Sequence, residues 1–480
     1  MKRRAVVRWT VRGLCLAAAV LFVLGGPAPV WLARLFPAAS PLTALAASVA
    51  RQRWILGLYW VIPPLALVAL ALWRGRFFCR WVCPLGTIYA LSSQFGRRRP
   101  LLRRFLNGYL FWTIVAASFA GVPLFLFLDP LSTFNRFGPL ARGLVSLAWL
   151  VPALLVPVFF ALGFVQPFVW CARICPLGYC FGFLRRLRRG WPKRGEKLDR
   201  TRREIVVGIF LGVPLGVLAR RFGFRSQGGP GRPVLPPGAA DPETFSALCS
   251  RCYSCVSVCP SRVIRVSAPG GRPLAQLFQP ELDTGRAACD PACNRCSQVC
   301  PTGAILPLTM AEKRHRQIGR ARVWPAACLA WTDERACMDC QRACPYAAIE
   351  TRFSPGGLPS PRVDRDRCRG CGTCQNVCPG NERGKAIIVH GVRRQRRLPE
   401  RSLIAAIDRS KCRAWADGAL CMLCQGVCEY DAIRDEPDEY GVSRPVIVAE
   451  ACIGCRACEI ECPGNDLGKA ISMAVVRQSG

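Results

Sequence analysis

The spacing of the cysteines constrains this chain more strongly than any other feature. Of its 30 cysteines, six lie in residues 1–225 and 24 in residues 226–480. The 24 form six quartets that all end in the spacing C-x2-C-x3-C, and proline follows five of the six. This spacing is typical of 4Fe–4S ligation, whereas zinc sites usually use two separated pairs and disulfide scaffolds suit small secreted chains. The sequence therefore predicts six 4Fe–4S clusters.

We expect the quartets to supply all the thiolate ligands of these clusters. The quartets are Cys249, Cys252, Cys255 and Cys259; Cys289, Cys293, Cys296 and Cys300; Cys328, Cys337, Cys340 and Cys344; Cys368, Cys371, Cys374 and Cys378; Cys412, Cys421, Cys424 and Cys428; and Cys452, Cys455, Cys458 and Cys462. An apolar pair such as Ala348-Ile349 follows each quartet. Its constant placement predicts a short strand that packs over the cluster.

The quartets also pair, because residues 328–387 match residues 412–471 at an offset of 84. We expect an α+β ferredoxin-like domain of three two-cluster, βαβ-type modules, at residues 246–310, 325–392 and 408–475, after a linker at 226–245. In two-cluster ferredoxins the fourth cysteine of each motif binds the other cluster. The expected crossed sets are Cys249, Cys252, Cys255 with Cys300; Cys289, Cys293, Cys296 with Cys259; Cys328, Cys337, Cys340 with Cys378; Cys368, Cys371, Cys374 with Cys344; Cys412, Cys421, Cys424 with Cys462; and Cys452, Cys455, Cys458 with Cys428.

Residues 1–200 have a different character, with long apolar runs. Four runs, near 11–36, 54–73, 105–128 and 144–167, approach the ~20 apolar residues that cross a bilayer. Arginines and lysines cluster before the first run and after the second and fourth, which predicts a cytoplasmic N-terminus. The sequence thus predicts an α-helical membrane domain of four to five transmembrane helices. Its partners would be membrane lipid and quinone.

A fifth apolar stretch, Ile205 to Ala219, follows the pair Arg202-Arg203. Paired arginines before a short apolar core are typical of a twin-arginine export signal, so residues 201–225 are a candidate signal anchor. A buried or amphipathic anchor is the alternative. The export interpretation puts the cluster domain in the periplasm.

Two CxxxCPLG motifs recur in the membrane half, and they contain Cys79 with Cys83 and Cys171 with Cys175. Cysteines four residues apart share a helix face, so the two pairs are candidates for one further metal or redox centre. Structural cysteines are the alternative. A bis-histidine haem is excluded in residues 1–200 because both histidines lie beyond them.

The loop from Asp129 to Arg136 contains our candidates for contact with a quinol head group, namely Asp129, Ser132 and Arg136. A helix cap and surface charge are the alternative roles. The formal net charge of +36 is explained by arginines and lysines that flank apolar segments. No nucleic-acid recognition motif accompanies it, so we expect no nucleic-acid partner.

With its CxxxCP motifs, residues 1–200 resemble the NapH/MauN membrane polyferredoxin family. With an arginine pair and serial ferredoxin motifs, residues 200–470 resemble the NapG/MauM family. The resemblance implies an electron-transfer protein of the bacterial inner membrane that relays electrons from quinol to a periplasmic oxidoreductase, rather than a stand-alone catalyst. Two alternatives stay open: a polyferredoxin relay that faces the cytoplasm, and a metal-handling or assembly reductase that uses the CxxxCP half.

Overall fold

The computed structural model describes most of the chain in two compact units. The described residues are 2–24, 37–51, 58–96, 106–120, 128–141, 151–189, 196–218, 221, 232–239, 241–266, 276, 278–332, 334–398, 403–428, 431–449, 451–452 and 457–475. The first unit comprises residues 1–228, 238–281 and 295–307. The second comprises residues 229–237, 282–294 and 308–480.

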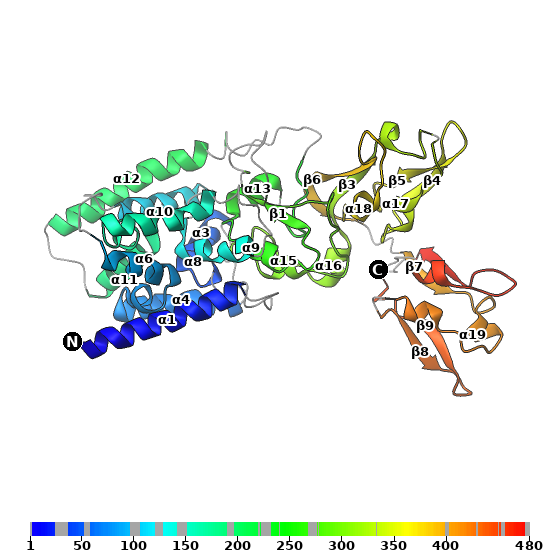
Figure 1. The fold of residues 1–480 in the computed structure, drawn as a ribbon, viewed down its shortest axis with the longest axis horizontal. Coiled ribbons are helices and arrows are strands. Elements are labelled where there is room, and N and C mark those ends of the chain that lie inside the picture. Colours follow the sequence, from blue (N-terminus) through cyan, green and yellow to red (C-terminus); the bar gives the residue numbers. More distant parts are fainter. Residues whose placement is uncertain are drawn as a thin grey trace. The chain divides into compact units, whose positions relative to one another are not determined.

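Helices build the N-terminal part of the first unit (Figure 1). They are α1 (Lys2–Leu24), α3 (Pro41–Arg51), α4 (Leu58–Arg74), α5 (Phe77–Trp81), α6 (Pro84–Gln94), α7 (Asn107–Phe119), α8 (Pro130–Asn135), α9 (Phe137–Ala141), α10 (Val151–Val165), the π-helix η3 (Val169–Ile174), α11 (Pro176–Arg188) and α12 (Glu196–Leu218). Proline stands at the first position of α6, α8 and α11, where its missing N–H costs no hydrogen bond. These three short helices share one buried core, which holds residues from each of them.

The expected domain of four to five transmembrane helices is wrong. Among the helices that the structure describes, none combines the length and the apolar character needed to cross a bilayer. A span needs about 20 apolar residues, but α4, α7 and α10 have 17, 13 and 15 residues. Helices α1 and α12 have 23 residues each, and the first half of each carries charges. Parts of the expected spans, at 25–36, 54–57, 105, 121–127 and 144–150, lie outside the described residues.

The candidate export segment forms the second half of α12 and packs along α7. Gly208, Gly212 and Gly216 are buried at four-residue spacing and lie directly against the backbone and side chains of α7. Because glycine has no Cβ, the two helix axes can approach closely. Arg202 and Arg203 are exposed at the start of this stretch.

Short helices and two-stranded sheets build the ferredoxin part of the chain. The elements of the first module are α13 (Pro242–Leu248), α14 (Ser254–Ser257), β1 (Ile264–Val266), β2 (Pro280–Leu282), α15 (Arg295–Gln298) and α16 (Met310–Arg314). Strand β3 (Arg316–Val323) pairs antiparallel with β6 (Ile387–Arg397) to enclose the second module. Between them lie η6 (Pro325–Ala327), α17 (Asp339–Arg342), β4 (Ile349–Phe353), β5 (Pro359–Val363) and α18 (Thr373–Val377).

The third module repeats the second at an offset of 84 residues. Its elements are β7 (Leu403–Ile407), α19 (Arg413–Ala416), α20 (Leu423–Gly426), β8 (Ile433–Pro437), β9 (Ser443–Ile447), α21 (Ala457–Glu461) and β10 (Ile471–Val475). Hairpin β8–β9 has the register Ile433↔Ile447, and hairpin β4–β5 has the register Ile349↔Val363, so both ends of the hairpin shift by the same 84 residues. Each of these modules includes a strand, β3 or β7, that precedes the range expected from its cysteines.

Candidate iron–sulfur sites and a buried cysteine pocket

The first ferredoxin module brings Cys249, Cys252, Cys255 and Cys300 together. The pKa of Cys249 is raised to about 12, chiefly by burial and also by the neighbouring thiols of Cys252 and Cys300, while Arg251 opposes the rise. Burial also raises the pKa of Cys255, with added contributions from Cys249, Cys252 and Cys300. Thiols influence one another in this way only at short range. This set is the crossed arrangement that the sequence analysis expects.

The second module contains two such sets. Cys328, Cys337, Cys340 and Cys378 line one small cavity. In the other set, the pKa of Cys344 is raised to about 12, chiefly by burial and also by Cys371 and Cys368. The pKa of Cys374 is also raised, first by burial and then by neighbours that include Cys344. Both sets are again crossed between quartets.

In the third module one buried apolar cluster contains cysteines of both quartets. Its members include Cys412, Cys424, Cys458 and Cys462, with Cys421, Cys428 and Cys452 packed against it. Cys455 lies outside the described residues. In the first module, Cys289 and Cys293 belong to the second unit, while Cys259 and Cys296 belong to the first.

Backbone amides donate hydrogen bonds to several of these sulfur atoms. The N–H of Ala348 lies 3.4 Å from Cys344 Sγ, and that of Ala432 lies 3.3 Å from Cys428 Sγ. Both alanines are the first residue of the apolar pair that follows a quartet, and their side chains are buried. The turns after Cys344 and Cys428 thus each aim an amide at the sulfur of the fourth cysteine. Such donors stabilise thiolates and tune cluster potentials.

The cysteine sets suit clusters better than single metal ions. Among the described residues, no three Cys, His, Asp or Glu side chains gather closely enough to bind one ion. In a 4Fe–4S cluster each thiolate binds a different iron, so the four sulfurs stand farther apart than the ligands of a single ion. All-cysteine donor sets with amide donors at the sulfurs therefore fit this group.

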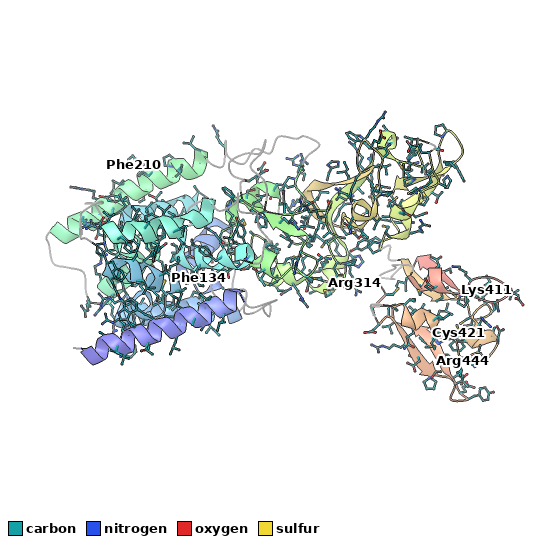
Figure 2. All side chains as sticks on the ribbon, in the orientation of Figure 1. Phe134, Phe210, Arg314, Lys411, Cys421 and Arg444 are labelled. Atoms are coloured by element: carbon teal, nitrogen blue, oxygen red, sulfur yellow. The ribbon has the colours of Figure 1, made fainter. Side chains whose placement is uncertain are left out.

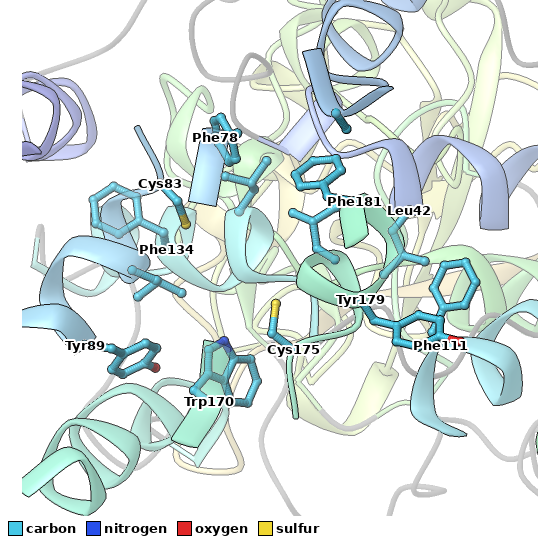
Figure 3. Close-up of a cluster of buried hydrophobic side chains, with 14 of the residues drawn as sticks. Leu42, Phe78, Cys83, Tyr89, Phe111, Phe134, Trp170, Cys175, Tyr179 and Phe181 are labelled. Atoms are coloured by element: carbon cyan, nitrogen blue, oxygen red, sulfur yellow. The ribbon is translucent and has the colours of Figure 1, made fainter. Parts of the chain in front are cut away.

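The cysteines of the two CxxxCP motifs lie together in the helical core. Cys83 caps the start of α6 by accepting the Gly86 N–H at 3.4 Å, and Cys175 caps α11 by accepting the Gly178 N–H at the same distance. Figure 3 shows both sulfur atoms pointing into the interior of one core. Cys171 packs against this core as well. We call the four cysteines of the two motifs the cysteine pocket.

Burial raises the pKa of all four thiols in the cysteine pocket. The pKa of Cys83 rises to about 11 and that of Cys175 to about 12, while the capping amides act in the opposite direction. The pKa of Cys79 is raised further by the other three cysteines. Next to the pocket, the indole Nε1 of Trp170 is buried without a hydrogen-bond partner. A sulfur-rich centre would supply that acceptor.

The Asp129–Arg136 segment lies beside the cysteine pocket. Helix α8 packs on α6, and the charge of Asp129 contributes to the raised pKa of both Cys83 and Cys175. Four spans from a cytoplasmic N-terminus would place this segment and the CxxxCP motifs on opposite sides of a bilayer. In the structure they share one core, which includes Leu131 and Phe134 of α8.

Asp129 and Ser132 form the cap of α8. The Asp129 carboxylate is fully buried and accepts the Ser132 N–H at 2.8 Å and the Ser40 hydroxyl at 2.6 Å. Burial raises its pKa, and these hydrogen bonds oppose the rise. The Ser132 hydroxyl is buried without a partner. Arg136, at the end of α8, points instead to the first ferredoxin module.

Sequence reasoning passed over two residues of this region, Asn135 and Trp170. Asn135 stands directly before Arg136 and donates to the Cys252 carbonyl at 2.8 Å. Trp170 directly precedes the cysteine of the second CxxxCP motif. Because each of these residues stands next to a candidate residue, its position in the sequence could have pointed to the site. The contacts that each one makes, however, are formed only in the folded chain.

Comparison with known families assigns iron–sulfur domains to three parts of the chain. A family described as a 4Fe-4S binding domain matches residues 56–103 and 145–194, which contain the two CxxxCP motifs. Two families described as 4Fe-4S dicluster domains match residues 248–305 and 335–381. No solved structure matches the chain.

Curated relatives of this chain include ferredoxin-type proteins named MauM and NapG. The methylamine utilization ferredoxin-type protein MauM of Methylobacillus flagellatus is 34% identical over 181 residues, which cover 35% of this chain and 74% of that protein. The chain belongs to the MauM family of ferredoxin-type proteins. MauM of Methylophilus methylotrophus is 33% identical over 155 residues, 30% of this chain and 66% of that protein. The ferredoxin-type protein NapG of Escherichia coli K12 is 30% identical over 187 residues, 36% of this chain and 73% of that protein.

This MauM-family chain is therefore a multi-cluster iron–sulfur electron-transfer protein. The count of six clusters, the extra centre in the cysteine pocket and the NapH/MauN resemblance of residues 1–200 stay predictions.

Proposed function

We propose that this protein relays electrons from a membrane quinol, at its helical region, to an oxidoreductase in the periplasm. A quinol releases two electrons and two protons when it becomes a quinone, and a chain of one-electron carriers takes the electrons singly. Clusters bound by the cysteine sets supply such carriers. The protein's own residues hold these cysteines in dry, buried surroundings and provide the route between them.

One observation carries the proposal. The Asp129–Arg136 segment packs on the cysteine pocket at one end, and at its other end it holds the cluster loop of the first ferredoxin module. A route from the helical region into the first ferredoxin module is therefore built of buried contacts.

Contact with lipid is part of the proposal. Exposed apolar side chains gather on α1 and α12, among them Leu14, Leu21, Val206 and Phe210, the last exposed by 76% (Figure 2). Large exposed apolar surfaces mark protein or membrane contacts, and quinol dissolves in lipid. The exposed Arg202-Arg203 pair before an apolar stretch, which is typical of a twin-arginine signal, supports export to the periplasm at the inner membrane.

A second element of the proposal is one iron–sulfur centre shared by both CxxxCP motifs. Each motif brings only two cysteines, so the matched domains at 56–103 and 145–194 must combine to supply four thiolates. The unpartnered Trp170 Nε1 and the capping amides of Gly86 and Gly178 support this donor set. The NapH/MauN resemblance of the motifs points the same way.

Reduction by quinol tests the main proposal. Purified protein in liposomes is mixed anaerobically with duroquinol, and cluster reduction is followed by electron paramagnetic resonance. We expect reduced-cluster signals with duroquinol and with dithionite. Reduction by dithionite but not by duroquinol would overturn the quinol donor. A relay that faces the cytoplasm would show as full protease protection of residues 226–480 in intact spheroplasts.

Iron content tests the shared centre. The double variant Cys83→Ser with Cys175→Ser keeps both helix caps, because serine is a favoured N-cap residue. We expect it to lose about four iron atoms per chain with unchanged helical content. The control Cys15→Ser should lose none. Equal iron in both variants would rule out the centre.

A further inference from the structure

Two side chains at the end of α8 hold the loop that carries the first two cysteines of the first module. Asn135 Nδ2 donates to the Cys252 carbonyl at 2.8 Å. Arg136 donates through Nε to the Arg251 carbonyl at 2.9 Å and through Nη2 to the Ser250 carbonyl at 3.1 Å. Asn135 is 5% exposed and Arg136 is 2% exposed. These contacts join residues more than 110 positions apart in the chain.

The loop needs this support because of its backbone conformation. Arg251 and Tyr253 adopt positive φ angles of 52° and 62°, which non-glycine residues adopt only when surrounding contacts compensate for the strain. The guanidinium of Arg251 itself donates to the Cys249 carbonyl at 2.7 Å. Every carbonyl from Cys249 to Cys252 therefore accepts a hydrogen bond from Arg251, Arg136 or Asn135.

Arg136 also brings a permanent positive charge into the interior. An arginine stays protonated in proteins, and a buried charge acts through a low effective dielectric. Arg136 lies close enough to Cys252 and Tyr253 to interact with both electrostatically. A cluster gains one negative charge when it is reduced, so a fixed positive charge beside it stabilises the reduced state.

We propose that Asn135 and Arg136 are positioning residues for the cluster bound by Cys249, Cys252, Cys255 and Cys300. They fix the ligand loop on the helical region, and Arg136 raises the reduction potential of that cluster. The cluster becomes the favoured entry point into the ferredoxin modules. This inference rests on a cluster at residues 248–305 and is independent of the electron donor and acceptor.

A redox titration of the full-length protein followed by electron paramagnetic resonance tests the proposal. The signal of this cluster is the one that is missing in Cys300→Ser. In Arg136→Gln we expect its midpoint potential to fall, with reduction becoming about tenfold less favourable, or about 59 mV for a one-electron couple. Arg136→Lys keeps the charge and should retain most of the potential.

Two further variants separate charge from loop support. Asn135→Ala removes a donor without a change in charge, so we expect faster loss of this cluster in air at an unchanged potential. Arg413→Gln removes an exposed arginine that directly follows a ligand cysteine, Cys412. Water screens that charge, so no potential should shift.

The outcomes are distinct. An unchanged potential in Arg136→Gln at full iron content would overturn the proposal, and so would an equal shift in Arg413→Gln. If Arg136→Gln assembles every cluster except this one, while Arg136→Lys assembles all of them, the positioning role is supported. If quinol does not reduce the clusters but Arg136→Gln lowers the midpoint potential as expected, the proposed function is wrong and the positioning role stands.

Discussion

Gly212 in α12 lies against Ala116 in α7, so that a Cβ atom on Gly212 would stand 2.7 Å from the Cβ of Ala116. It would also stand 2.6 Å from the Thr113 carbonyl oxygen. Gly212 is the middle one of the three buried glycines, Gly208, Gly212 and Gly216, through which α12 packs on α7. The segment expected to be an export signal is thus also a packing element.

The contact reverses the usual effect of a glycine-to-alanine change. In an open helix that change stabilises by about 1 kcal/mol, and we expect this for Gly13→Ala in α1, where no atom lies within 4 Å of the new Cβ. For Gly212→Ala we expect destabilisation by about 1–3 kcal/mol from overpacking. Thermal unfolding of both variants gives the comparison. A higher melting temperature for Gly212→Ala would show that the helices do not pack closely.

Crossed ligation predicts which cluster each fourth cysteine serves. Cys300→Ser should disturb the cluster of Cys249, Cys252 and Cys255, since these are its neighbours in the structure. We expect iron to fall by about four atoms per chain, the content of one 4Fe–4S cluster. Cys15→Ser is the control. A loss confined to the cluster of Cys289, Cys293 and Cys296 would instead indicate uncrossed ligation.

The two equivalent hairpins differ in one titratable residue, so we expect the stability of the β8–β9 hairpin in the third module to depend on pH and that of the β4–β5 hairpin in the second module not to share this dependence. In the β8–β9 turn the Asp438 carboxylate accepts the N–H groups of Tyr440 and Val442 and pairs with Arg444 at 2.9 Å. These contacts, the Val442 N–H first, lower the pKa of Asp438. The equivalent residue in the β4–β5 turn is Ser354, which has no charge to lose.

The sign of the effect follows from the lowered pKa. The stabilisation by Asp438 is fully present above the pKa of about 3.9 of an unfolded aspartate, and it is lost as the pH falls through the lower folded value. After division by the intrinsic exchange rate at each pH, the protection of the β8–β9 amides should therefore fall in acid, more than that of β4–β5. In Asp438→Ser the two hairpins should respond alike, and a persistent difference would refute the assignment.

Two equivalent tryptophans differ in their surroundings. Both indoles donate to a proline carbonyl, Trp331 to Pro361 at 3.3 Å and Trp415 to Pro445 at 3.2 Å. Only Trp415 has a described guanidinium over its ring, that of Arg409 at 4.1 Å from the centroid. A cation–π contact contributes about 0.5–1 kcal/mol at an exposed site. Trp415→Leu should therefore open its module to protease more than Trp331→Leu does, and Arg409→Gln should reduce that difference, with the guanidinium of Arg444 still 5.8 Å from the ring centroid.

Local spacing in the sequence was sufficient to predict the ferredoxin modules. Three cysteines of each set lie within a few residues of one another, so chain geometry alone keeps them close. The 84-residue repeat then predicted equivalent folds for the second and third modules, and the hairpin registers agree with it. The amide donors at Cys344 and Cys428 also follow from local sequence, through the apolar pair that begins the next strand.

The arrangement of the helical region could not be predicted from the sequence and became clear only in the tertiary structure. Apolar composition predicted transmembrane spans because hydropathy records side-chain character and not helix length, and the described helices proved too short or too charged. Spacing in the sequence by itself predicted which cysteines bind clusters, since three of the four ligands in each expected set are close along the chain. Only the folded structure decided that the CxxxCP motifs share a core with Asp129 and that Arg136 holds the Ser250–Cys252 loop, because these contacts join residues far apart in sequence.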